Sequence, residues 1–134
     1  MPLVRIDLIR GRSEAQVAAV GDCVQRALVE HMNVPERDRF QVITEHDARH
    51  FVYDRAYLGV ERTDGIFFVQ VTLSQGRTTG QKQAFYAKAA ELLARDAGVR
   101  PGDVAISIVE STREDWSFGN GVAQYLVLPK EQWK

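Results

Sequence analysis

The alternation of hydrophobic and polar positions along this chain predicts two strand–helix–strand units in succession. Strand-like runs start at Leu3 (LVRIDLI) and at Ile66 (IFFVQVTL), and each leads through Gly-Arg into a helical pattern. A further strand is predicted after each helix, from Arg39 (RFQVIT) and from Asp103 (DVAISIV). The apolar faces of the two helices comprise Val17, Val20, Val24, Ala27 and Leu28 in the first, and Phe85, Ala89, Leu92 and Leu93 in the second.

Both helices carry matching signals at their ends. Each is predicted to begin with a capping box, in which a hydroxyl and an amide side chain satisfy free helical N–H groups. The two boxes are Ser13 with Gln16, and Thr78 with Gln81. Asn33 and Gly98 lie at equivalent positions past the helix ends, and both residue types tolerate the left-handed geometry of a C-terminal cap.

The two units are copies of one another. At an offset of 65 positions the stretch from Val4 aligns with the stretch from Val69, and identities continue without a gap to Glu45 and Glu110. We therefore divide a single domain, residues 1–134, into pseudo-repeats 1–65 and 66–134. Because each crossover helix should join parallel strands, we predict an α+β fold with one four-stranded mixed sheet and two helices on one face.

The opposite face of such a sheet must also be covered. A second copy of the chain could cover it, so we expect an oligomer. Residues 46–64, which join the repeats, are predicted to hold a short strand or turn. Near the end of the chain, DWSFGNG (residues 115–121) is predicted to be a loop, AQYLVL from Ala123 a last short strand, and the charged run 113–115 a solvated loop.

Composition narrows the class of partner. Hydrophobic residues make up 45% of the chain and charged residues 26%, with a formal net charge of −1, so neither nucleic acid nor a membrane is an expected partner. Charged residues interrupt the first segment where a secretory signal would be apolar. Cys23 is the only cysteine and cannot form an internal disulfide, which fits a cytoplasmic protein.

Pro2 is the position at which the repeats differ most in chemistry. It aligns with Phe67, and a proline early in an inner strand removes a backbone hydrogen-bond donor. Such residues are common at chain ends without any function. Methionine before proline is normally excised in cells, however, and Pro2 would then be a free secondary amine. Nearby cations or an apolar pocket would lower the pKa of that amine and make it a base, whereas a carboxylate would keep it an acid.

Motifs along nearly the whole chain resemble the tautomerase superfamily, whose members carry a catalytic amino-terminal proline on a β-α-β building block. The start, PLVRIDLIRGRSEAQ, is similar to 4-oxalocrotonate tautomerase. The stretches VPERDRFQVITEHD, LGVERTDG, QGRTTGQKQ and DWSFGNGVAQY are closer to malonate semialdehyde decarboxylase and its relatives. The resemblance implies a homotrimer that acts on a small carboxylate substrate. We expect no cofactor and no metal.

The same resemblance nominates the site. Pro2 matches the catalytic proline, Asp38 the family aspartate and Arg77 an active-site arginine. The pocket-lining segment matches Trp116, Phe118 and Tyr125. Some of the decarboxylases carry two arginines just before the second helix, whereas only Arg77 is present here, with Ser74 and Gln75 beside it.

Each candidate also has a purely structural interpretation. Asp38 could cap a turn, as its repeat partner Asp103 is expected to do, and the three aromatic residues could belong to the core. Arg77 and Arg12 occupy helix starts, where the helix dipole disfavours cations. That position favours a role for Arg77 in holding a carboxylate. Since only one repeat carries a proline, only one of the two equivalent sites should be active.

Three classes of function remain open, and the first is an enzyme. A decarboxylase would use cationic Pro2 to polarise a carbonyl or to condense with it as an iminium, while a keto-enol tautomerase would use neutral Pro2 to shuttle a proton. An ionised Asp38 close to Pro2 favours the cation, and hence the decarboxylase-like or hydratase-like chemistry with some tautomerase activity. The alternatives from other classes are an oligomeric signalling protein and a small-ligand binding module on the same scaffold.

Overall fold

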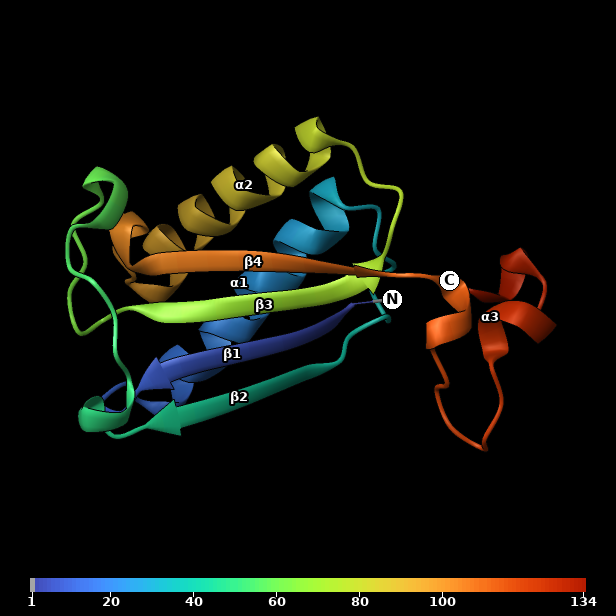
Figure 1. The fold of residues 1–134 in the computed structure, drawn as a ribbon, viewed down its shortest axis with the longest axis horizontal. Helices are drawn as coiled ribbons and strands as arrows, with labels where there is room; N and C mark the ends of the chain where they lie inside the picture. Colours follow the sequence, from blue (N-terminus) through green and yellow to red (C-terminus); the bar gives the residue numbers. More distant parts are fainter. Residues whose placement is uncertain (1) are drawn as a thin grey trace.

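The structure, a computed structural model, describes residues 2–134 and has the predicted α+β architecture (Figure 1). One four-stranded sheet with strand order β2-β1-β3-β4 packs against two long helices on one face. The elements are β1 (Leu3–Ile9), α1 (Glu14–His31), β2 (Gln41–His46), β3 (Phe67–Ser74), α2 (Thr79–Ala97) and β4 (Val104–Ser111). Each repeat is therefore one β-α-β unit, and the two units share a continuous sheet.

Strand direction follows from the connections. The crossover helices make β1 parallel to β2, and β3 parallel to β4, while β1 and β3 meet antiparallel in the middle of the sheet. The antiparallel junction places the starts of β1 and β3 at opposite ends of the sheet. Two equivalent sites, one from each repeat, therefore lie far apart in the same molecule.

The core lies between the sheet and the helices. Alternate residues of the two central strands, Val4, Ile6 and Leu8 of β1 and Phe67, Val69, Val71 and Leu73 of β3, are almost completely buried there. They meet the apolar faces of α1 and α2 that the helical spacing predicts, including Val24, Leu28, Phe85 and Leu92. Intervening strand residues such as Phe68 point to the other, partly exposed face.

Both predicted capping boxes are present. The side chains of Ser13 and Thr78 accept from the backbone N–H three residues on, and the glutamine at that position bonds back to the cap. Asn33 and Gly98 follow the helices with φ of 54° and 66°, the left-handed geometry expected of them. Because α2 begins at Thr79, its first turn lies directly after Arg77, which therefore sits where the chain leaves β3 for α2.

The structure corrects the expected last strand and resolves the segment between the repeats. AQYLVL contains a short helix, α3 (Gln124–Val127), because the Gln124 amide bonds the backbone of Phe118 and Gly119 and curls the segment back over the preceding loop. Residues 46–64 contain no additional strand: His46 ends β2, and two 3₁₀ turns follow, at Ala48–His50 and Tyr57–Gly59. Among residues 2–134, no helix is both long and apolar enough to cross a bilayer.

Candidate active site

Pro2 is buried at the start of β1, at the end of the sheet where the C-terminal segment packs (Figure 1). The register fixes its surroundings: the Val4 N–H donates to the Phe40 carbonyl at 2.9 Å, and Leu3 pairs with Thr72. Pro2 therefore has the Asp38–Phe40 segment on one side and the end of β3 on the other. Met1, whose removal would free the Pro2 amine, lies outside the described residues.

Arg77 reaches the same end of the sheet from the turn between β3 and α2. Its Nε donates to the Met32 carbonyl at 2.8 Å and its Nη1 to the Ser74 carbonyl at 3.0 Å. These two bonds hold the guanidinium in place and leave Nη2 without a hydrogen bond among the described residues. Burial lowers the pKa of Arg77, opposed by the electrostatic influence of Tyr125 and Asp38. The side chain is thus an immobilised, partly desolvated cation close to Asp38.

Asp38 lies on the other wall of the site, in the turn that leads into β2. Burial raises the pKa of its carboxyl group, and the positive charge of Arg77 acts in the opposite direction. Beneath this turn, the Gln25 amide of α1 donates to the carbonyls of Glu36 and Asp38 and fixes the backbone. A helix of the first repeat therefore positions the aspartate, while a turn of the second repeat positions the arginine.

A cavity of about 440 Å³ joins Asp38 and Arg77, whereas buried Pro2 is not among the residues that line it. Asp38, Arg77 and Tyr125 line it together with Asn33, Gln81 and Arg113. Its size suits a small organic ligand. Burial raises the pKa of Tyr125 to about 12, so its hydroxyl stays protonated over the ordinary pH range and can donate a hydrogen bond. The cavity therefore combines cations, a neutral hydroxyl donor and one carboxyl group.

The three predicted aromatic residues, Trp116, Phe118 and Tyr125, pack on one another, but not all of them line a cavity. Tyr125 lines the main cavity, and with Phe118 it also lines a neighbouring one of about 220 Å³, which shares Asp38 and Trp133. Phe118 packs edge-to-face on Tyr125 with ring centroids 5.0 Å apart. Trp116 lines neither of these two cavities; it stacks on Phe118 at 5.8 Å and donates to the Ser111 hydroxyl. It therefore supports the wall rather than forming its surface.

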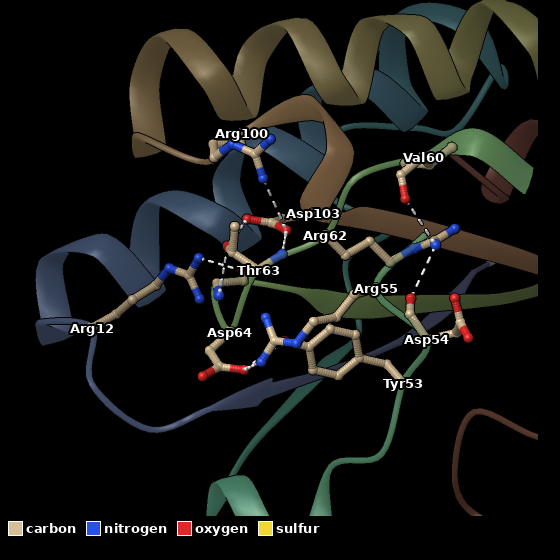
Figure 2. Close-up of polar contacts among 11 residues, drawn as sticks. Arg12, Tyr53, Asp54, Arg55, Val60, Arg62, Thr63, Asp64, Arg100 and Asp103 are labelled. Carbon is tan, nitrogen blue, oxygen red and sulfur yellow. Dashed lines mark hydrogen bonds and ion pairs between the residues drawn. The ribbon is translucent and has the colours of Figure 1, made fainter. Parts of the chain in front are cut away.

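The equivalent position in the second repeat is closed, as Figure 2 shows. Asp103 is only 2% exposed and accepts from both the backbone N–H and the hydroxyl of Thr63, at 2.7 and 2.6 Å. Arg12, the counterpart of Arg77, donates to the Gly65 carbonyl at 2.6 Å. Phe67, at the position of Pro2, is fully buried, with the Arg12 Cζ 5.6 Å from its ring centroid.

The segment between the repeats is what closes this second position. It supplies Thr63 and Gly65, and next to them Tyr53 and Arg55 both bond Asp64 (Figure 2). At the proline end the equivalent segment, residues 112–134 after β4, lines an open cavity instead (Figure 1). The pseudo-symmetry of the chain is therefore broken twice, by Pro2 in place of Phe67 and by the hydrogen-bonded side chains that surround Phe67.

Comparison with known proteins identifies the family. The tautomerase enzyme models match residues 38–119 and residues 2–60. A probable tautomerase of Bacillus subtilis (strain 168), YusQ, is 44% identical over 94% of this chain and 99% of its own length. This chain belongs to the tautomerase family. A second probable tautomerase of that strain, YrdN, is 40% identical over 94% of the chain and 97% of its own.

Solved structures of tautomerase relatives share the fold closely. A malonate semialdehyde decarboxylase inhibited by 3-bromopropiolate superposes with a TM-score of 0.88 and 42% identity, over 95% of this chain and 99% of that chain. A second malonate semialdehyde decarboxylase, described with decarboxylase and hydratase activities, also has a TM-score of 0.88. It is 35% identical, over 92% of this chain and 95% of that chain. A fused 4-OT symmetric trimer has a TM-score of 0.75 at 21% identity, which shows the fold alone.

Sequence reasoning missed the contribution of the C-terminal segment to this tautomerase site. Arg113 was expected in a solvated loop; its side chain is exposed, but it also lines the main cavity, as do Trp133 and Lys134. Trp133 packs on Tyr125 with ring centroids 4.8 Å apart. A tryptophan at the end of a polar tail is the one sequence signal that could have indicated this packing.

Proposed function

We propose that this tautomerase acts on small carboxylates bearing a carbonyl or enol group, and that the free amine of Pro2 is its acid. The observation that carries the proposal is the convergence of three groups at one end of the sheet. Pro2 is buried just before β1, whose Val4 N–H bonds the Phe40 carbonyl soon after the Asp38 turn, and Asp38 and Arg77 line one cavity. An amine, a carboxyl group and an immobilised guanidinium are the groups such chemistry needs.

The charge state of the amine decides the reaction. A free α-amino group titrates at about 7.7–8.0, and the secondary amine of proline is more basic. The Asp38 carboxylate favours the cation, while Arg77 and burial oppose it. We infer that Asp38 prevails, because its turn adjoins the start of β1 through the bond from the Val4 N–H to the Phe40 carbonyl, whereas two backbone carbonyls hold Arg77 in its turn. Pro2 is then protonated and donates a hydrogen bond.

A 3-oxo carboxylate is the substrate that suits this arrangement. Arg77 binds and orients the carboxylate, and the Pro2 N–H points to the carbonyl oxygen. When the bond to the carboxylate carbon breaks, CO₂ leaves and the electron pair passes into the carbonyl, where cationic Pro2 stabilises the enolate oxygen. The Pro2 cation then gives a proton to the enolate carbon, which yields the aldehyde or ketone, and the neutral amine regains a proton from water. Proton transfer without loss of CO₂ is keto-enol tautomerisation, which we expect as a slower activity.

The relatives support this assignment. Two are malonate semialdehyde decarboxylases, and one of these is described with hydratase activity as well. The acid role of the amine is common to both reactions, because a protonated donor also polarises a carbonyl or a double bond toward water. We therefore propose malonate semialdehyde decarboxylase activity, with an enol carboxylate such as phenylenolpyruvate as a tautomerase substrate.

We also propose that the working form is a trimer. The sheet face opposite the helices leaves Val42, Phe68 and Val109 about 40% exposed, and β2 and β4 are open edges. Exposed apolar side chains beside unpaired strand edges are a surface that another copy can cover. A fused 4-OT relative with the same fold is a symmetric trimer.

The test is turnover of malonate semialdehyde and phenylenolpyruvate by wild type, Pro2→Ala and Arg77→Ala. Arg12→Ala is the matched control, because it removes the counterpart guanidinium from the closed end of the molecule. We expect Pro2→Ala to lose at least about a hundred-fold in kcat/KM, the usual contribution of a general acid. Arg77→Ala should lose about ten-fold or more with its hydrogen bond to the charged carboxylate, and Arg12→Ala should retain turnover. Equal rates in all four proteins would contradict the proposal.

A further inference from the structure

Arg77 offers a substrate carboxylate only part of its guanidinium. Its Nε–H and one Nη1–H already donate to the carbonyls of Met32 and Ser74, so the N–H groups that remain for a ligand are those of Nη2 and the second one of Nη1. A carboxylate held by a guanidinium prefers two parallel N–H donors. A second cation lining the cavity would supply further donors to the carboxylate, and the position two residues before Arg77 holds Gln75 and not an arginine.

Arg113 is placed to be that second cation. The strands β3 and β4 run parallel and end in register at Ser74 and Ser111, and the Gln75 N–H donates to the Ser111 carbonyl at 2.8 Å. Arg77 lies two residues past Gln75, and Arg113 two residues past Ser111. The two arginines thus leave neighbouring strands at the same end of the sheet, and both line the 440 Å³ cavity.

The surroundings of Arg113 leave its charge uncompensated. Its guanidinium lies over the Trp133 ring, with Cζ 4.8 Å from the centroid, and makes no ion pair or hydrogen bond to any residue from 2 to 134. The nearby Asp115 carboxylate is engaged elsewhere, since it accepts from the Thr112 N–H and hydroxyl at 2.7 and 2.9 Å. A stacked arginine keeps all its N–H donors at the ring edge available for an anion.

We propose that Arg113 is a second carboxylate-binding residue of the proline site, working with Arg77, and that it sets the preference of this chain for anionic substrates. The inference rests on the proposed function and deepens it by assigning the residue that replaces the absent second arginine. Because Arg113 stacks on Trp133, and Trp133 packs on Tyr125, the C-terminal segment is what positions this cation. Arg77 would anchor one oxygen of the carboxylate and Arg113 the other.

The experiment compares an acid with its neutral ester. Phenylenolpyruvate and its methyl ester are turned over by wild type, Arg113→Gln and Arg113→Lys, with Arg49→Gln as a control that removes an equal charge from an exposed 3₁₀ turn between the repeats. Loss of a hydrogen bond to a charged group costs about ten-fold or more in affinity. We therefore expect Arg113→Gln to raise KM for the acid about ten-fold, to leave the ester within two-fold, and Arg113→Lys to recover part of the loss.

The acid-to-ester ratio is a readout that a merely structural role would not move. Equal effects of Arg113→Gln on acid and ester, or no effect on either, would overturn the inference. Failure of the proposed function has a different signature, since Pro2→Ala would then retain turnover of both compounds. In that case calorimetric titration of 3-phenylpropanoate still decides: about ten-fold weaker binding to Arg113→Gln supports the assignment, and equal affinity overturns it.

Discussion

Asp38 illustrates, at the scale of single residues, how a functional group costs stability. Burial raises the pKa of its carboxyl group, so the folded chain binds a proton more readily than the unfolded chain does. This contribution to the free energy of unfolding is fully present below the ordinary aspartate pKa of about 3.9. It is lost as the pH rises through the higher pKa that Asp38 has in the folded chain. A carboxyl group that served only as a structural cap would normally show the opposite trend.

Asp38→Asn should therefore gain stability relative to wild type as the pH rises, while losing turnover. Asparagine has nearly the same shape and no ionisation, so it removes the pH-dependent cost together with the charge that holds the Pro2 cation. Urea unfolding of both proteins from pH 3 to pH 8 measures the difference. If the free energy of unfolding of wild type instead rose relative to that of Asp38→Asn as the pH rises, the folded site would favour the charged carboxylate.

Single residues also show what the sequence could and could not predict. Asp38 and Arg77 follow from repeat alignment and family motifs, because both lie in the β-α-β block that the pattern specifies. Arg113 and Trp133 enter the cavity only because the Gln124 amide and the stacked aromatic rings fold the C-terminal segment against it. Such contacts have no periodic signature, so local pattern reasoning assigned Arg113 to a solvated loop.

The helices offer a matched pair of tests at the scale of elements. Thr78 and Ser13 make equivalent capping boxes, but only the Thr78 box adjoins the arginine of the open site. Thr78→Ala and Ser13→Ala should each lower the free energy of unfolding by about 1 kcal/mol. Thr78→Ala should in addition raise KM, because the first turn of α2 positions Arg77.

Thermal or urea unfolding together with steady-state kinetics separates the two effects. Equal KM values in the two alanine variants would mean that the carbonyls of Met32 and Ser74 hold Arg77 without help from the cap. The strands and helices themselves were predictable to within about two residues, since their apolar periods and caps agree. The last helix was not predictable, because the sequence AQYLVL is compatible with a short strand or with a helix. Its side-chain contacts determine which of the two forms.

The C-terminal segment should behave as a wall of the site that contributes little to the core. Trp133 contacts Tyr125 and Arg113 and donates to the Leu128 carbonyl, all within or next to that segment. Trp133→Ala should raise KM several-fold while changing the free energy of unfolding by only about 1 kcal/mol, the range of one aromatic pair. Kinetics and unfolding of the same preparation test this, and a large loss of stability with unchanged KM would contradict it.

At the scale of the whole molecule, nothing in residues 2–134 covers the sheet face opposite the helices. Val109 is 40% exposed there, beside the open edge of β4, whereas Tyr86, at 37%, lies on α2 on the helical side. If the chain trimerises through the sheet, Val109→Glu should lower the molar mass in solution and Tyr86→Glu should not. Light scattering coupled to size-exclusion chromatography measures both. A wild type that runs as a monomer would remove the trimer from the account.

The proposed chemistry requires the Pro2 nitrogen to be an unblocked amine close to Asp38 and Arg77. Titration of the ¹⁵N-labelled Pro2 nitrogen by NMR, in wild type, Asp38→Asn and Arg77→Met, tests this most directly. We predict a wild-type pKa above neutrality, lowered when the carboxylate is removed and raised when the guanidinium is removed. A pKa well below neutrality, or one that neither substitution moves, would contradict the account.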